Sequence, residues 1–163
     1  MAARRGRQVG PSALHRGDGL GTETALTEAI DEILETFEFF DDWEERYQYV
    51  IDLGKTLPPM ADALKTDATK VKGCQSQVWL HARADAQDAT RLVFEADSDA
   101  HIVRGLAAIL LALYSGRTSA QIMETDSRAL FDRLGLDQAL SPSRANGLHS
   151  MDQRVKALAA EAG

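Results

Sequence analysis

The apolar positions near the start of the chain follow the 3.6-residue period of an α-helix. Thr24 is a suitable N-cap for this first helix. Its apolar face is formed by Leu26, Ile30, Ile33, Leu34 and Phe37. A second helix is predicted after Asp41, because Asp41 and Glu44 have the spacing of a capping box. This helix should end near Gly54, which favours a left-handed C-cap, before Pro58-Pro59 prevents its continuation.

Beyond Cys74 the hydrophobic period changes to two, which is typical of a β-strand. Residues 78–83 and 91–96 both alternate apolar and polar positions and are separated by a polar turn. Together they predict an antiparallel hairpin. The stretch before Cys74 gives weaker signals, a helical turn at 60–64 and a short strand at 69–72.

The last part of the chain is helical again. Ser98 is predicted to cap a helix that is apolar around most of its circumference and ends at Ser115-Gly116, which makes it the candidate for the core-spanning element. Two short helices are predicted near 119–124 and 127–133, and Ser141-Pro142 marks the start of the last helix. The order of helices, a small antiparallel sheet and further helices is typical of an α+β fold.

Charge is distributed unevenly along the 163 residues. Residues 1–21 hold four arginines and one aspartate, whereas residues 22–163 hold 14 basic and 24 acidic side chains. We therefore expect a basic, disordered tail over 1–23 and a single domain over 24–163. An acidic domain argues against nucleic acid and anionic membranes as partners. With no secretory signal, the expected location is cytoplasmic, and an organellar transit peptide is the alternative interpretation of the acid-poor tail.

The single cysteine, Cys74, is the main candidate for chemistry. One cysteine excludes an internal disulfide and a four-thiolate metal centre, and no metal site is expected. Gly73 permits a tight or left-handed turn before it. Lys70 and Lys72 lie nearby in the sequence and should favour the thiolate over the thiol. From residue types alone, a reactive thiol and an inert one both stay open.

Two charged residues are weaker candidates. Asp99 belongs to Asp97-Ser98-Asp99, which is typical of a strand end followed by a helix N-terminus, where acidic charge is favourable. Arg144 lies in the first turn of the last helix, where a cation opposes the helix dipole. This local conflict favours a functional role for Arg144, and a solvated arginine or a surface ion pair is the alternative.

The segment Gly73–Trp79 (GCQSQVW) resembles the active-site segment of the SufE-like sulfur-transfer proteins. Three further stretches agree with this family in the same order, residues 43–58 (WEERYQYVIDLGKTLP), 97–106 (DSDAHIVRGL) and 141–148 (SPSRANGL). The resemblance covers about residues 26–160, and four segments in the right order make it specific.

The resemblance implies a fold and a role. The fold is α+β, with an antiparallel sheet of two to three strands packed against several helices, as in SufE and the IscU-type scaffold proteins. Cys74 would accept a persulfide sulfur from a cysteine desulfurase, SufS-like or CsdA-like, and pass it to a SufBCD-like iron–sulfur scaffold. The chain would be a sulfur carrier rather than a stand-alone enzyme, and would bind no cofactor, since the pyridoxal phosphate belongs to the desulfurase. The residues implied to support Cys74 or to bind the partner are Gly73, Gln75, Ser76, Gln77, Asp99 and Arg144.

Alternatives stay open at this point. A CsdE-type acceptor shares these motifs and serves a different desulfurase. A Cys-His hydrolase would need a histidine within hydrogen-bond reach of Cys74, and the spacing of the four histidines specifies none. A non-catalytic binding module with an incidental thiol is the third alternative.

Overall fold

The computed structural model describes residues 19–162. Its first elements are α2 (Gly19–Phe39), α3 (Trp43–Lys55), the short 3-10 helix η1 (Asp62–Leu64), β2 (Val78–Ala84) and β3 (Arg91–Ser98). They are followed by α4 (His101–Tyr114), β4 (Arg117–Thr118), α5 (Ser119–Glu124), α6 (Ser127–Leu134), α7 (Leu136–Ala139) and α8 (Pro142–Ala162). The predicted α+β class is confirmed.

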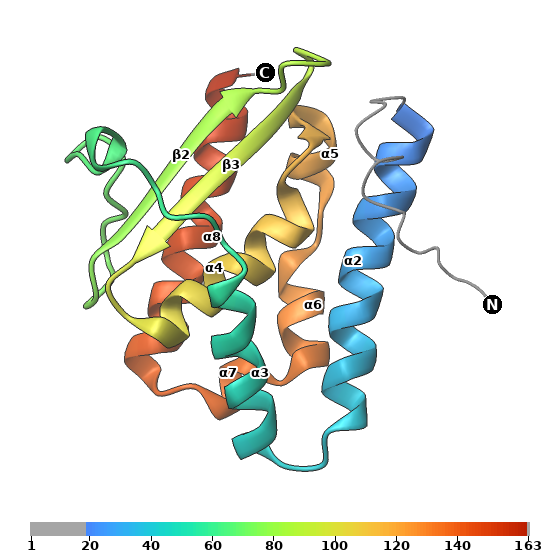
Figure 1. The fold of residues 1–163 in the computed structure, drawn as a ribbon, viewed down its shortest axis with the longest axis vertical. Coiled ribbons are helices and arrows are strands. Elements are labelled where there is room, and N and C mark those ends of the chain that lie inside the picture. The colour runs from blue at the N-terminus through green and yellow to red at the C-terminus, as the bar shows by residue number, and fades with distance from the viewer. Residues whose placement is uncertain (1–18, 163) are drawn as a thin grey trace.

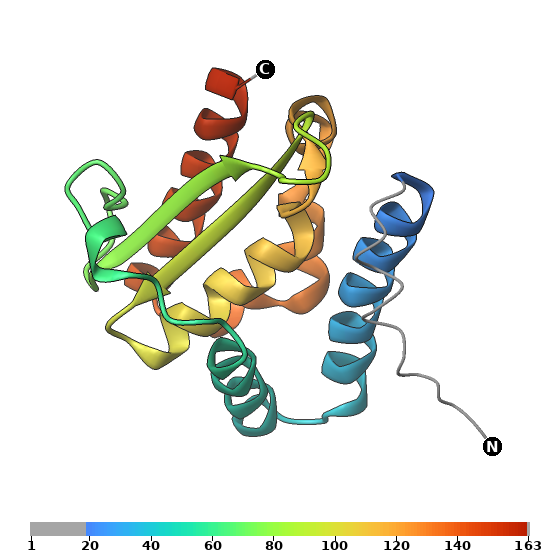
Figure 2. The same ribbon diagram turned by 45° about the horizontal axis from the view of Figure 1, so that its top comes forward.

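The sheet is antiparallel with the strand order β2-β3-β4. Strands β2 and β3 pair from Val78 opposite Ser98 to Ala84 opposite Leu92, which confirms the predicted hairpin. Because β3 runs through Ser98, the N-cap of α4 is Ala100 and not Ser98, and the Ser98 hydroxyl accepts a hydrogen bond from the Ala100 N–H at 3.2 Å. The hairpin lies across α4 and α8 (Figures 1 and 2).

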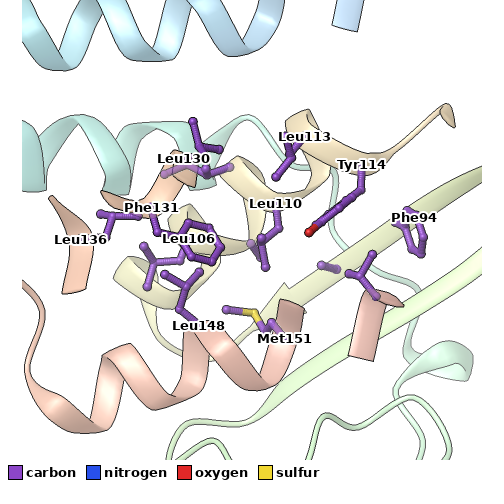
Figure 3. Close-up of a cluster of buried hydrophobic side chains, with 14 of the residues drawn as sticks. Phe94, Leu106, Leu110, Leu113, Tyr114, Leu130, Phe131, Leu136, Leu148 and Met151 are labelled. Atoms are coloured by element: carbon purple, nitrogen blue, oxygen red, sulfur yellow. The ribbon is translucent and has the colours of Figure 1, made fainter. Parts of the chain in front are cut away.

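Helix α4 is the centre of the hydrophobic core, as predicted. Ten of its 14 residues are buried, and it packs against α2, α3, α8 and β3. Figure 3 shows Leu106 and Leu110 of α4 pointing toward Phe131 of α6 and toward Leu148 and Met151 of α8. The N-terminal half of α8, which carries part of the candidate site, is therefore anchored to the most buried element.

Gly54 is not a left-handed C-cap, so that prediction is wrong. It lies inside the last turn of α3, where an added Cβ would come within 2.7 Å of the Gly105 nitrogen of α4. A Cβ on Gly105 would clash with the Val50 carbonyl oxygen. The two glycines instead allow α3 and α4 to cross with their backbones in contact, and the C-cap of α3 is Thr56, which has a right-handed conformation.

Two predicted helix starts shift by a few residues. Helix α2 begins at Gly19 rather than at Thr24, so residues 19–23 of the predicted tail are helical. The apolar stripe of this helix begins at Leu26, so the hydrophobic pattern gives no signal for the first turn, which starts at Gly19. The N-cap of α3 is Asp42, one residue later than predicted, and its carboxylate accepts a hydrogen bond from the Glu45 N–H at 2.9 Å. Residues 1–18 lie outside the described residues, and the basic tail there stays a prediction.

Candidate functional site

Cys74 lies in a closed loop, residues 72–77, that leads into β2. The loop is closed where the Val71 N–H donates to the Val78 carbonyl at 2.8 Å. The short strand predicted at 69–72 is present only as an isolated bridge to β2. The loop therefore begins and ends at the sheet, and its middle extends over α8.

Gly73 has a positive φ of 88°, one of the conformations that a glycine at this position permits. An added Cβ would lie 2.6 Å from the Ser150 hydroxyl oxygen of α8. A side chain at this position is therefore unfavourable for two reasons, the positive φ of the backbone and the close contact with α8. Gly73 seats the loop on the helix and directs the next residue, Cys74, toward the N-terminal part of α8.

The Cys74 thiol is half-buried against the backbone of α8. Its sulfur lies 3.7 Å from the Gly147 carbonyl oxygen, at the distance of a weak S–H hydrogen bond. Burial raises the pKa of the Cys74 thiol above its ordinary value. The expectation that Lys70 and Lys72 favour the thiolate is therefore wrong for this conformation. Both lysines line a cavity to which Cys74 does not contribute. Docked on α8, Cys74 is a protected thiol.

A cavity of about 290 Å³ opens beside the thiol. Its lining comes from the loop, from α4 and from the N-terminal part of α8. The buried apolar members are Val103, Leu106, Leu148 and Met151, and the polar members are Gln75, Ser76, Ser141, Ser143 and Arg144. Three of the residues predicted from the sequence, Gln75, Ser76 and Arg144, thus line one cavity with Cys74, and this cavity has an apolar wall and a polar rim.

Arg144 is the only cation that lines this cavity among the described residues, and it lies on the exposed rim. Its guanidinium carbon lies 5.9 Å from the ring centroid of Tyr47 on α3, an arrangement typical of a cation–π contact. Over the part of the chain that the structure describes, no carboxylate forms an ion pair with it. The Ser141 hydroxyl caps α8 by accepting from the Arg144 N–H at 3.3 Å. The guanidinium can therefore pair with an anion that enters the cavity.

Asp99 and Gln77 hold the other end of the loop and do not line the cavity. The Gln77 N–H donates to the Asp99 carboxylate at 3.1 Å, and the Asp99 N–H donates to the Gln77 carbonyl at 3.3 Å. This reciprocal pair joins the exit of the loop to the start of α4. Both residues position Cys74 indirectly.

Sequence reasoning missed the ion pair that supports this region. Asp97 is buried and accepts hydrogen bonds from the Arg104 Nε at 2.8 Å and from the Met60 N–H at 3.1 Å. Arg104 also donates to the carbonyl oxygens of Gly54 and Leu57, both at 2.8 Å. One ion pair thus joins β3, α4 and the end of α3. An available signal was that Arg104 is the one charged residue in the apolar stretch from Ile102 to Leu113.

The alternative chemistries find little support in this geometry. No histidine of the described chain lines the Cys74 cavity, and His15 lies outside the described residues. His149 instead lies 3.0 Å from the Asp137 carboxylate and packs against Phe131. Over residues 19–162 no group of three acidic, histidine or cysteine side chains is arranged to hold a metal ion. In the same part of the chain, none of the helices combines the length and apolar character needed to span a bilayer.

Comparisons with known proteins identify the family of the chain. The family model described as "SufE: Fe-S metabolism associated domain" matches residues 31–159. An uncharacterized SufE-like protein of Rhizobium meliloti (strain 1021) is 52% identical over 130 residues, which is 78% of this chain and 92% of the relative. One from Rhizobium etli is 48% identical over 136 residues, 82% of this chain and 91% of the relative.

A solved structure shares the fold. The solution structure of a hypothetical protein from Thermus thermophilus aligns with a TM-score of 0.66 over 82% of this chain and 95% of its own length. At 20% sequence identity this likeness concerns the fold alone. The family model and the two relatives carry the assignment: the chain belongs to the SufE family, whose members transfer sulfur in iron–sulfur metabolism.

Proposed function

We propose that Cys74 accepts sulfur from the persulfide of a cysteine desulfurase. The observation that carries the proposal is a lone thiol on a glycine-hinged loop, beside a cavity whose single described cation has no carboxylate partner among residues 19–162. The Cys74 thiolate attacks the terminal sulfur of the donor persulfide. A new S–S bond forms while the S–S bond of the donor breaks, and the donor cysteine leaves as a thiolate. The transferred sulfur keeps its oxidation state, so no external oxidant or reductant is needed.

The cavity suits the product of this exchange. A persulfide extends the side chain by one S–S bond of about 2.05 Å, and the cavity of about 290 Å³ has room for it. The apolar wall limits access of water and oxidants to the new sulfur. Arg144 supplies a positive charge for a persulfide anion on the exposed side. Cys74 and Arg144 thus hold and stabilise the cargo, while Gln75 and Ser76 border it.

The attack requires a change at the loop. While Cys74 is docked on Gly147, burial raises the pKa of its thiol and keeps it protonated. The partner would draw the loop away from α8, which removes the burial and lowers the pKa of the thiol toward its ordinary value. Gly73 gives the backbone the freedom to do so, and the Gln77–Asp99 pair keeps the far end of the loop attached.

The finer assignments follow from the same proposal. The sulfur donor is a SufS-like desulfurase, with a CsdA-like enzyme as the alternative partner, and the recipient is a SufBCD-like scaffold. Pyridoxal phosphate stays on the desulfurase, and this chain carries sulfur without a bound cofactor of its own. The exchange takes place in the cytoplasm, whose reducing conditions keep a lone cysteine available as a thiol.

Mass spectrometry tests the proposal directly. The chain is incubated with a purified SufS-type desulfurase and free cysteine, digested without reductant and analysed for the peptide that holds Cys74. We expect a gain of one sulfur atom that is lost on reduction and absent from the Cys74→Ser variant. A peptide that gains no sulfur while its thiol still reacts with iodoacetamide would refute the acceptor role.

A further inference from the structure

A second cavity, of about 390 Å³, lies next to the first along α8. It lies between segment 67–72 and the middle of the helix, and Gly73, packed on Ser150, separates it from the Cys74 cavity. Its charged and polar lining residues are Lys70, Lys72, Arg154, Asp67, Ser150 and Gln153. Any partner that reaches Cys74 from this side must therefore contact a positively charged surface.

The positive charge on this surface is not neutralised by the described part of the protein. Asp67 is the one acidic residue among those lining the cavity. Within residues 19–162, no carboxylate forms an ion pair with Lys70, Lys72 or Arg154. Lys72 is exposed, and the other two cations are half-buried at the edge of the cavity. We call Lys70, Lys72 and Arg154 the basic face.

The basic face lies on the opposite side of the molecule from α2, the longer of the two acidic helices (Figures 1 and 2). Residues 19–55, which form α2 and α3, hold eleven acidic and two basic side chains, whereas residues 56–163 hold 13 acidic and 12 basic side chains. Nearly all of the excess negative charge therefore belongs to α2 and α3. The segment between η1 and β2 lies on the opposite side of the molecule from α2 (Figures 1 and 2).

We infer that the basic face is the docking surface for an acidic patch on the sulfur donor, beside the cysteine that donates the sulfur. This inference rests on the proposed function. Complementary charge accelerates association and selects the orientation of encounter. The same acidic patch is repelled by the acidic helix α2, which lies on the opposite side of the molecule (Figures 1 and 2), so the side with the basic face meets the donor first. A nucleic acid is the less suitable occupant, because the net charge of the chain is −7.

Binding to a purified SufS-type desulfurase, without cysteine present, tests the surface separately from sulfur transfer. We expect the Lys72→Glu/Arg154→Glu variant to bind about tenfold more weakly than wild type at low salt, and the difference to shrink as salt screens the charges. The control is Arg128→Glu/Arg133→Glu on α6, a helix that packs against α2. It makes the same change in net charge at two exposed positions and should bind nearly as wild type does.

If the double variant folds poorly, the single variant Lys72→Glu replaces it in the assay. The Lys72 side chain is exposed, so this substitution should not disturb folding. It should weaken binding in the same salt-dependent way, while iodoacetamide modifies Cys74 at the wild-type rate. Equal affinity of wild type and both variants, or an equal loss in the α6 control, would overturn the docking surface. Saturable binding of inorganic phosphate at this face would also overturn it, in favour of a small-anion site. If sulfur still reaches Cys74 in the mass-spectrometric assay, the acceptor role survives either result.

Discussion

Replacing Gly73 with alanine should release the Cys74 loop from α8. The wild-type backbone has φ of 88° at this position, a conformation that alanine adopts only with strain. The new Cβ would also lie 2.6 Å from the Ser150 hydroxyl oxygen. Both effects raise the free energy of the docked loop, and neither acts on a loop that has left the helix. The substitution should therefore shift the loop toward the state in which Cys74 is accessible.

The size of the shift follows from the backbone conformation. A non-glycine residue in the left-handed region costs about 1–2 kcal/mol. The Ser150 contact adds less, because this hydroxyl can rotate away. A free-energy change of about 1–2 kcal/mol alters a two-state ratio by roughly 5–30-fold. If modification of Cys74 passes through the undocked loop, its rate should rise by this factor.

The assay is the rate of iodoacetamide modification of Cys74 at neutral pH, followed by mass spectrometry. The double variant Gly73→Ala/Ser150→Ala removes the steric contact and keeps the backbone strain, so it should retain most of the increase. Gly116→Ala is the matched control, since Gly116 has φ of 89° and lies at the end of α4, away from the loop. It should lower global stability by a similar amount and leave the modification rate of Cys74 close to that of wild type.

An unchanged rate in the Gly73→Ala variant would refute the reasoning. It would mean that the docked loop does not limit access to the thiol, or that alanine is accommodated without undocking. A rate increase of the same size in Gly116→Ala would be equally damaging, because general destabilisation rather than local release would then explain the effect. Circular dichroism and denaturant titration of all four proteins separate these outcomes.

Three further predictions concern the thiol and its support. Because burial raises the pKa of Cys74, its modification rate should keep rising with pH beyond about 8.5, the ordinary thiol value. Arg104→Met leaves Lys65, 3.5 Å away, as the remaining charged partner of the buried Asp97 carboxylate, and denaturant titration should show a loss of about 3 kcal/mol. Gly105→Ala forces a Cβ against the Val50 carbonyl, and its free energy of unfolding should fall by about 1–3 kcal/mol or more; wild-type stability would contradict the close helix crossing.

The Asp97 carboxylate also makes stability depend on pH. Burial raises its pKa, but hydrogen bonds from Met60, Ser98 and Arg104 outweigh burial and hold the pKa below its ordinary value. A lowered pKa in the folded state stabilises the protein above the pKa of the unfolded chain, and this contribution disappears as the pH falls through the folded value. The stability of Arg104→Met should therefore depend less on pH in the acidic range than that of wild type.

Much of the fold was predictable because its main elements are long and periodic. Helix α4 and the β2–β3 hairpin each repeat one pattern over many residues, so the local pattern is enough to identify them. Strand β4 has two residues and α7 has four, and neither is long enough to form a period. Gly54 was misread for another reason. A glycine near a helix end looks the same in sequence whether it caps the helix or admits a neighbouring backbone, and only Gly105 of α4 distinguishes the two.

For the candidate site, the sequence indicated some of the residues but not the state of the thiol. The conflict of Arg144 with its helix dipole favoured a functional role, which stays a prediction, and the structure places this residue at the Cys74 cavity. The state of the thiol was not predictable. It depends on Gly147, which is distant in sequence, and on the orientation of two lysines that neighbour Cys74 in the chain but line the other cavity. The two lysines are close to Cys74 in the sequence but do not lower the pKa of its thiol in this conformation.

This separation of lysines and thiol suits the sulfur-acceptor role proposed for Cys74. A cysteine whose thiolate was stabilised at all times would react with oxidants and free thiols between encounters. Here burial on α8 raises the pKa of the thiol, and the positive charge lies on an adjacent surface where a partner can meet it. Under the proposed function, docking at the basic face and release of the loop would occur in one event, so that the pKa of Cys74 falls where the donor persulfide is already present. On this proposal the reactivity of Cys74 is tied to the partner.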